Sequence, residues 1–449
     1  MTDTIAAIAT AAGAGGIGVL RISGPMAEGI AETLLRRPPK ARYAHYARFQ
    51  DADGSLIDHG LLVFFPAPRS YTGEHVLELQ VHGSAPVLAT LLQRVCALGS
   101  RIARPGEFTE RAFLNGKLDL AQAEAVADLI AAGSQAAARA ALRSLAGEFS
   151  KRVETLRQGL LSLRVHVEAA IDFPEEEIDF LGDGQIAAAL ASLRAEHLDL
   201  LTESQRGQRL RDGLHVVIVG PPNAGKSSLL NALTGSDRAI VTAVAGTTRD
   251  LLHETLQIDG VELSLVDTAG LRQHSDDPIE REGMRRAHAE SRGADLLLAV
   301  VEDGDGNAAL ELQQALAEGV LGKDAAIVWV HNKIDQSDSQ PHREDSSDGV
   351  HLWLSATRGD GLAALRELLK VAATGDSATG AFSARARHVA ALLHVGEQLE
   401  LADQQLQVGA GELVAAELRC AHETLGQITG DVRSDDLLGE IFSSFCVGK

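Results

Sequence analysis

Cysteine is scarce in this sequence. Cys96, Cys420 and Cys446 are the three present, and neither a metal-ligand spacing nor a disulfide framework connects them. Because structural disulfides form in oxidising compartments, a chain with so few cysteines is typical of a reducing one. We therefore expect a cytoplasmic protein.

Long apolar runs and an N-terminal basic region are also missing. No run has the roughly 20 apolar residues that a helix needs to cross a bilayer. No basic residue precedes Arg21, which does not fit a secretory signal, and a single arginine does not fit a transit peptide. The sequence therefore predicts no membrane span.

Basic residues are outnumbered by acidic ones. The chain has 62 acidic against 41 basic residues and a formal net charge of -21. Polyanions would be repelled on average, so any contact with nucleic acid would need a local basic patch or a partner protein. A simpler interpretation stays open, in which the acidic surface only keeps the protein soluble.

A length of 449 residues predicts about three domains. Residues 1–117 mix strand-like and helix-like segments, with strands expected at 17–22, 61–65 and 76–81 and a helix at 85–98. Residues 118–211 are rich in helix-forming Ala, Leu, Glu and Arg. Residues 376–449 have the same helical character. The first segment is therefore expected to be an α+β domain, and the two helical segments to form one discontinuous domain.

The segment between the helical parts, residues 212–375, has a different pattern. Short apolar strands are expected at residues 215–219, 262–266, 295–301, 326–330 and 351–354, and helical stretches separate them. This alternation is typical of a parallel or mixed sheet with crossover helices. We therefore predict an α/β domain that is inserted into the helical domain.

A phosphate-binding motif lies at the start of the inserted segment. Residues 220–227 fit G-x-x-x-x-G-K-S, directly after a predicted strand and before a predicted helix. Backbone N–H groups of such a loop surround phosphate oxygens, and the helix N-terminus adds positive potential. Lys226 would neutralise the β and γ phosphates, and the hydroxyl of Ser227 would ligate magnesium. The predicted nucleotide contacts here are Asn223, Ala224, Gly225, Lys226, Ser227 and Ser228.

Three further motifs follow, each at the end of a predicted strand. Asp267 can hold the magnesium ion through water, and the run Asp267, Thr268, Ala269 and Gly270 would reach the γ phosphate. Asn332, Lys333 and Asp335 form N-K-x-D, in which the Asp335 carboxylate would accept two hydrogen bonds from guanine and Lys333 would pack over the base. Adenine lacks that donor pair, so ATP would leave the carboxylate unpaired. Ser355, Ala356 and Thr357 would contact the guanine oxygen through backbone N–H groups. Together the motifs predict a GTP-binding P-loop domain.

The loop between the phosphate-binding motif and Asp267 resembles a nucleotide-sensing switch. Thr248 is expected as a second magnesium ligand, and an Asn223 amide oxygen beside a loop carbonyl could hold a monovalent cation. The predicted nucleotide contacts of this loop are Thr242, Ala243, Val244, Ala245, Gly246, Thr247 and Thr248. Leu271 stands where many small GTPases place a water-orienting glutamine. Glu280 is the candidate replacement, although the residues alone favour an exposed helix-start carboxylate.

These motifs, and several stretches outside them, resemble the MnmE (TrmE) family of tRNA-modification GTPases, with a G domain of the TrmE-Era-EngA-YihA-Septin type. The matching stretches are residues 3–7, 20–24, 71–74, 104–124, 220–227, 240–250, 267–272 and 445–449. The resemblance implies an N-terminal folate-binding and dimerising domain, a two-segment helical domain and an inserted G domain. It also implies a homodimer that works with a flavin-containing partner at C5 of the wobble uridine of certain tRNAs, using a methylene-tetrahydrofolate one-carbon unit.

The same resemblance assigns roles to individual residues. It implies a potassium-stimulated GTPase with Asn223, Thr242, Val244 and Thr247 as potassium ligands, and it makes Glu280 catalytic, reversing the preference from the residues alone. Arg21, Glu78, Lys117 and Lys449 match folate-contacting positions. Cys446 is a candidate nucleophile or a small buried residue. A regulatory or ribosome-assembly GTPase without modification chemistry is the alternative function, because both classes share the G-domain motifs.

Overall fold

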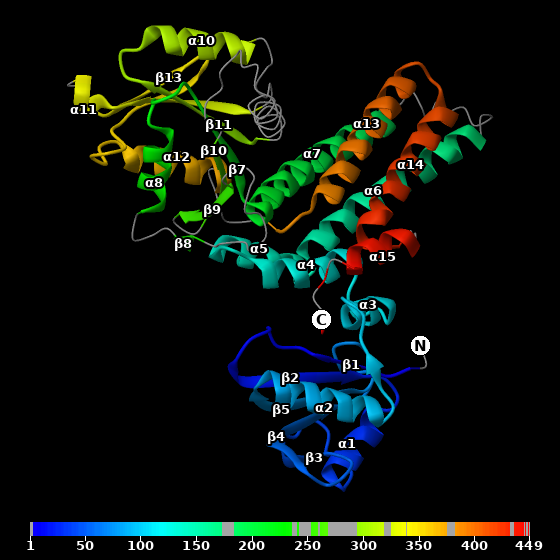
Figure 1. The fold of residues 1–449 in the computed structure, drawn as a ribbon. Coiled ribbons are helices and arrows are strands. Elements are labelled where there is room, and N and C mark those ends of the chain that lie inside the picture. Colours follow the sequence, from blue (N-terminus) through cyan, green and yellow to red (C-terminus); the bar gives the residue numbers. More distant parts are fainter. Residues whose placement is uncertain are drawn as a thin grey trace, which may run out of the picture. The chain divides into compact units, whose positions relative to one another are not determined.

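The computed structural model describes residues 3–172, 184–235, 240–241, 253–258, 261–267, 294–317, 325–337, 339–374, 382–431, 435–443, 445 and 448. The chain forms two compact units, and Figure 1 shows their elements. Unit 1 comprises Met1–Ala127, Leu145–Arg194 and His394–Lys449, and unit 2 comprises Asp128–Ser144 and Ala195–Leu393. Each unit therefore combines segments that are far apart in the sequence.

The N-terminal part of unit 1 is a six-stranded sheet with helices packed against both of its faces. Its strand order is β3-β4-β5-β2-β1-β6, and only the β1–β6 pair is parallel. The strands are β1 (Ile5–Ile8), β2 (Gly15–Ser23), β3 (His45–Gln50), β4 (Leu56–Phe65), β5 (Val76–Gly83) and β6 (Arg101–Ile102). The helices are α1 (Ala27–Leu35), α2 (Ala85–Ala97) and α3 (Glu107–Leu114). The three predicted strands and the predicted helix are confirmed, whereas β1, β3, α1 and α3 were not anticipated.

Alternation along the strands gives this sheet two different faces. Leu20, Ile22, Leu77 and Leu79 pack in a core with residues of α1 and α2. Because successive side chains of a strand point to opposite faces, the residues between them lie on the other face. Arg21 of β2 is one of these.

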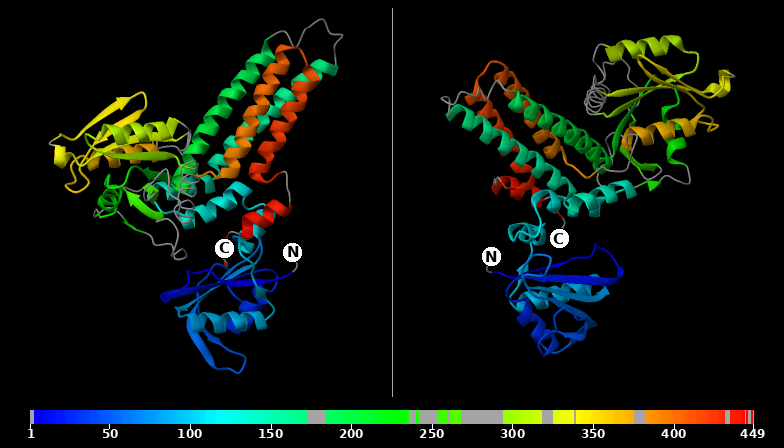
Figure 2. Two further views of the ribbon diagram at one scale, coloured as in Figure 1. Left: turned by 45° about the horizontal axis from the view of Figure 1, so that its top comes forward. Right: turned by 180° about the vertical axis from the view of Figure 1, so that it is seen from behind.

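The helices that precede and follow the inserted segment in the sequence are divided between unit 1 and unit 2. They are α4 (Leu120–Ala131), α5 (Gln135–Leu145), α6 (Glu148–Asp172), α7 (Gln185–Asp212), α13 (Ala386–Gln407), α14 (Gly411–Thr429) and α15 (Asp435–Ser443). α6 and α14 lie side by side in unit 1, as Figure 2 shows from two directions. Leu160 of α6 and Leu418 of α14 are fully buried. The predicted discontinuous helical domain is confirmed by this pairing.

Unit 2 is built on an eight-stranded mixed sheet, in the order β13-β14-β12-β11-β7-β10-β9-β8. The strands are β7 (Leu214–Val219), β8 (Ile240–Val241), β9 (His253–Ile258), β10 (Val261–Asp267), β11 (Leu296–Glu302), β12 (Ala326–Asn332), β13 (His342–Ser346) and β14 (Gly349–Trp353). The five central strands from β14 to β10 are parallel, and the outer ones are antiparallel. All five strands predicted for this segment are present.

Helices cover both faces of the second sheet. They are α8 (Lys226–Thr234), α10 (Gly306–Ala317), α11 (Ile334–Ser337) and α12 (Leu362–Thr374). Leu229 of α8 and Leu365 of α12 share one core with Val216 and Val328, and Leu312 of α10 belongs to the core on the opposite face. The parallel central strands end at one edge of the sheet, where ligand-binding loops of such folds gather. No helix of the described residues is long and apolar enough to traverse a bilayer.

Candidate nucleotide-binding site

The loop between β7 and α8 curls tightly. Gly220 has φ +153°, Asn223 has φ 66° and Gly225 has φ +93°, which is left-handed backbone. A Cβ on Gly225 would lie 2.2 Å from Nδ2 of Asn332, and one on Gly220 would lie 2.1 Å from the carbonyl oxygen of Val300. Both positions therefore require glycine, because a side chain would collide with neighbouring strand ends.

Lys226 extends back into this loop. Its Nζ donates to the carbonyl oxygens of Gly220 and Pro221, both at 3.0 Å, and the residue is 7% exposed. Ser227 follows in the first turn of α8. A buried ammonium group next to a helix N-terminus is an environment that favours an anion, and phosphate is the anion that such loops bind.

Asn332 connects two loops of the site. Its Nδ2 donates to the carbonyl oxygen of Ala224 at 2.9 Å, and its Oδ1 accepts from the backbone N–H of Ala356 at 3.0 Å. The side chain is 2% exposed. Asn332 thus fixes the distance between the phosphate-binding loop and the Ser355–Thr357 segment, a role that its sequence motif did not reveal.

The predicted guanine-recognising residues lie together after β12 and β14. Oγ of Ser355 donates to Oδ1 of Asp335 at 2.5 Å and lies 3.1 Å from Oγ1 of Thr357. The hydrogen bond from Ser355 lowers the pKa of Asp335, so this carboxylate is ionised at neutral pH. Nζ of Lys333 lies 2.5 Å from Oε2 of Glu302. Asp335 also lines a cavity of about 240 Å³ with Arg358 and other residues of the same edge.

Asp267 ends β10 beside the phosphate-binding loop. It lies opposite Ile218 of β7 in the parallel register, two residues before the loop begins at Gly220. The structure thus places Asp267, Lys226, Asn332 and Asp335 at the same edge of the sheet. Their convergence follows from the parallel strand order rather than from their spacing in the sequence.

The predicted folate-contacting residues of the first sheet lie on the face opposite α1 and α2. Arg21 and Glu78 are directly opposed on β2 and β5, and Nη2 of Arg21 is 2.9 Å from Oε1 of Glu78. The Arg21 guanidinium lies 5.6 Å from the ring centre of Tyr71 and 6.0 Å from that of Phe108. Both charged side chains are about one-fifth to one-quarter exposed, at 24% and 20%. Lys117, beyond α3, is exposed.

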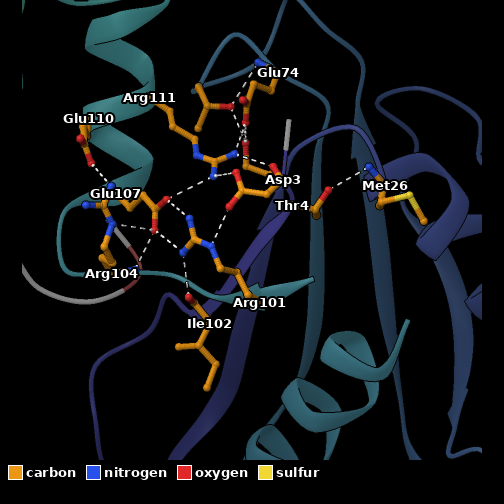
Figure 3. A network of polar contacts seen from close by, with 12 residues as sticks. Asp3, Thr4, Met26, Glu74, Arg101, Ile102, Arg104, Glu107, Glu110 and Arg111 are labelled. Carbon is orange, nitrogen blue, oxygen red and sulfur yellow. Dashed lines mark hydrogen bonds and ion pairs between the residues drawn. The ribbon is translucent and has the colours of Figure 1, made fainter. Parts of the chain in front are cut away.

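A buried ion network supports this region, and sequence reasoning missed it (Figure 3). Arg111 of α3 is fully buried, and its guanidinium contacts Asp3 at 2.9 Å, Glu74 at 3.0 Å and Glu107 at 3.2 Å. Arg101 contacts the same Glu107 at 2.5 Å. Burial alone would raise the pKa of Glu107, but the hydrogen bonds from Arg101, from a backbone N–H and from Arg111 outweigh it and lower the pKa to about 2. The network joins the segment before β1, β6, α3 and the loop before β5.

Comparison with known proteins decides the family. The family model described as GTP-binding protein TrmE N-terminus matches residues 4–117, and the MnmE helical domain model matches residues 120–446. The tRNA modification GTPase MnmE of Xanthomonas campestris pv. campestris (strain 8004) is 55% identical over 453 residues, covering 100% of this chain and 99% of the relative. The chain belongs to the MnmE family.

Other members of the MnmE family are similarly close. The tRNA modification GTPase MnmE of Pseudomonas syringae pv. tomato (strain ATCC BAA-871 / DC3000) is 54% identical, and that of Marinobacter nauticus (strain ATCC 700491 / DSM 11845 / VT8) is 52% identical. Both alignments cover 100% of this chain and 99% of the relative. Among solved structures, the G domain of the T. maritima FeoB iron transporter matches 36% of this chain and 98% of its own, at 24% identity and a TM-score of 0.27. That score is too low to bear on function.

Several residues that the MnmE resemblance marks lie outside the described part of the chain. They are the switch-loop residues from Thr242 to Thr248, the run Thr268, Ala269 and Gly270, and Glu280, Cys446 and Lys449. The potassium ligands including Asn223, the magnesium ligands Ser227 and Thr248, and both catalytic candidates stay predictions. The domain boundaries at 117, 211 and 375 stay predictions as well.

Proposed function

We propose that this chain is a GTP hydrolase that takes part in tRNA modification. The observation that carries the proposal is the bridge made by Asn332, which holds the phosphate-binding loop of Lys226 at a fixed distance from the Asp335–Ser355 pair. Such a bridge fits a nucleotide that has phosphates at one end and a base at the other. Membership of the MnmE family, whose named relatives are tRNA modification GTPases, supports the same conclusion.

Different residues of the site would bind the phosphates and the base of the nucleotide. Lys226 would exchange its two carbonyl partners for β and γ phosphate oxygens, and amides of the curled loop would donate to the same phosphates. Asp335 is ionised and accepts one hydrogen bond from Ser355, which leaves acceptor capacity for the guanine N–H donors. ATP offers no such donor pair, so discrimination against it follows.

Magnesium and potassium fit the oxygen donors of this site. Ser227 supplies a hydroxyl in the first turn of α8, and Asn223 supplies an amide on left-handed backbone within the loop. Magnesium would neutralise charge between the β and γ phosphates, and potassium would do so near the switch loop. Glu280 is the proposed positioning group for the attacking water.

A comparison of salts tests this proposal. GTP hydrolysis by the full chain is measured in potassium chloride and in sodium chloride at equal ionic strength, with ATP as control substrate. Faster turnover in potassium with inert ATP is expected. Equal rates in the two salts would remove the potassium role, and hydrolysis of ATP at the rate of GTP would remove the role of Asp335.

The finer proposal concerns the modification chemistry. A methylene-tetrahydrofolate derivative would supply the one-carbon unit for C5 of the wobble uridine. The chain would act in the cytoplasm as a homodimer, together with a flavin-containing partner protein. The Arg21–Glu78 pair beside Tyr71 offers a cationic donor, an anionic acceptor and an aromatic surface, which suit the carboxylate, amine and ring of a folate.

Folate binding is testable without tRNA. The affinity of the full chain for tetrahydrofolate is measured by calorimetry for the wild type, Arg21→Gln and Arg48→Gln. Arg48 is an exposed arginine of β3, the edge strand of the same sheet, and serves as the matched control. Loss of affinity in the first variant alone is expected. Equal affinities in all three proteins would exclude Arg21, and no binding at all would favour a regulatory GTPase without modification chemistry.

A further inference from the structure

One buried carboxylate contacts both chain connections between the helices and the G domain, the one that enters the G domain and the one that leaves it. The outgoing connection is the end of α7 with Arg211, and the returning connection runs from Phe382 to Arg385 before α13. Asp128, near the end of α4, contacts both. Its side chain is 6% exposed. All of these residues belong to unit 2.

Four hydrogen bonds converge on Asp128. Oδ1 accepts from Nε of Arg211 at 2.8 Å, and from Nη2 and Nε of Arg385 at 2.8 and 3.2 Å. Oδ2 accepts from Oγ of Ser383 at 2.8 Å. Both oxygens of the carboxylate are therefore used, Oδ1 by the two arginines and Oδ2 by Ser383, so one group holds the outgoing and the returning connection.

The backbone reinforces the same junction. Ser383 donates its N–H to the carbonyl oxygen of Ala140 in α5 at 3.1 Å, and its own carbonyl accepts from Oγ of Ser144 at 2.8 Å. Gly207 of α7 lies so close to the returning segment that a Cβ there would be 1.9 Å from the carbonyl oxygen of Phe382. The two connections are therefore in direct contact, and α5 holds one of them in place.

The geometry points to Asp128 as a positioning residue that couples the G domain to the helices. Both chain connections between the nucleotide-binding domain and the helices are hydrogen-bonded to its side chain. If nucleotide exchange changes the conformation of the G domain, Arg211 and Arg385 would move. Because both are hydrogen-bonded to Asp128, α4 would move with them. This inference rests on the proposed GTP cycle but assigns a role to a residue of α4, outside the nucleotide-binding loops.

A purely structural carboxylate would hold the fold without passing on the nucleotide state, so the test must separate the two. Hydrogen exchange of backbone amides is measured on the full chain with GDP and with a non-hydrolysable GTP analogue. The proteins are wild type, Asp128→Asn, Asp128→Glu and the control Asp403→Asn. Asp403 also joins two helices through an arginine, Arg194 at 2.9 Å, but lies on neither connection. Asp128→Asn keeps the size and one acceptor oxygen while removing the charge that both arginines share.

In wild type and Asp403→Asn, we expect the exchange of α4 and α5 peptides to differ between the two nucleotides. In Asp128→Asn this difference is lost, while peptides of the phosphate-binding loop still respond and GTP turnover stays within about twofold. Asp128→Glu, which restores the charge, regains part of the difference. The inference is overturned if α4 responds equally in Asp128→Asn and wild type, or if wild-type α4 does not respond while the phosphate-binding loop does. Failure of that loop to respond in wild type would instead overturn the proposed GTP binding, and the coupling with it.

Discussion

Glu107 offers the sharpest test of the buried network in the N-terminal domain. Its side chain is 1% exposed and lies between Arg101 and Arg111. Replacing it by glutamine keeps the shape and one acceptor but leaves the fully buried Arg111 with less negative charge around it. The pKa of Glu107 falls from the ordinary 4.5 to about 2 on folding. At about 1.4 kcal/mol per pH unit, this corresponds to about 3 kcal/mol of stability at neutral pH.

The sign of this contribution sets its pH window. Because the folded-state pKa is depressed, the stabilisation is fully present above about pH 4.5 and is lost as the pH falls towards 2. The difference between wild type and Glu107→Gln should therefore be about 3 kcal/mol at neutral pH and close to zero near pH 2. Carboxylates outside the network titrate in the same way in both proteins and cancel in the difference.

Urea titrations of the full chain can measure this difference locally. The three tyrosines of the chain, Tyr43, Tyr46 and Tyr71, all lie in the N-terminal domain, so tyrosine absorbance reports its unfolding. Glu110→Gln is the matched control, since Glu110 lies on the same helix and pairs with Arg104, which is 63% exposed. We expect the control to cost under about 1 kcal/mol at any pH. A Glu107→Gln loss as small as the control, or one that persists undiminished near pH 2, would refute the electrostatic account.

Three predictions concern the nucleotide site. Gly225→Ala should abolish binding of a fluorescent GTP analogue, because its Cβ would lie 2.2 Å from Nδ2 of Asn332 on left-handed backbone, and unchanged affinity would contradict the loop geometry. Asn332→Ala removes two hydrogen bonds to backbone groups of separate loops and should weaken the same binding by roughly 10- to 30-fold, at about 1 kcal/mol each; an effect below about threefold would show that the bridge is dispensable. Asp335→Asn should move the preference in a hydrolysis assay from GTP to XTP, because an amide N–H can donate to the extra oxygen of xanthine, and retained GTP preference would place base recognition elsewhere.

The fold was predictable where hydrophobic pattern alone decides it. β7, β11 and β12 are nearly continuous apolar runs, as expected for strands buried on both faces. β13 reads His-Arg-Glu-Asp-Ser and is exposed throughout, so no local pattern marks it. Its pairing with β14 depends on the sheet already being in place. Long helical stretches were likewise predictable, but their division into α4, α5 and α6 was not.

The site was predictable where a motif fixes backbone geometry, and less so where partners are distant in sequence. The curled loop before α8 and the Asp335 segment lie where the motifs placed them. The bridge by Asn332 was not foreseen, because its partners Ala224 and Ala356 are set by strand order. Arg111 gave no signal at all, since an arginine is expected at the surface unless three carboxylates from elsewhere in the fold surround it. Asp128 was overlooked for the same reason.

The pairing of α6 with α14 has a consequence for biosynthesis. α6 ends at Asp172, yet its partner begins only at Gly411, after the ribosome has made the whole G domain. At a translation rate of about 5 to 20 residues per second, roughly 10 to 50 s pass between the synthesis of α6 and that of α14, which packs against it. Leu156, Leu160 and Val167 would be accessible to chaperones or to other nascent chains during that interval. The G domain can meanwhile complete its own sheet, so the inserted domain matures before the domain that hosts it.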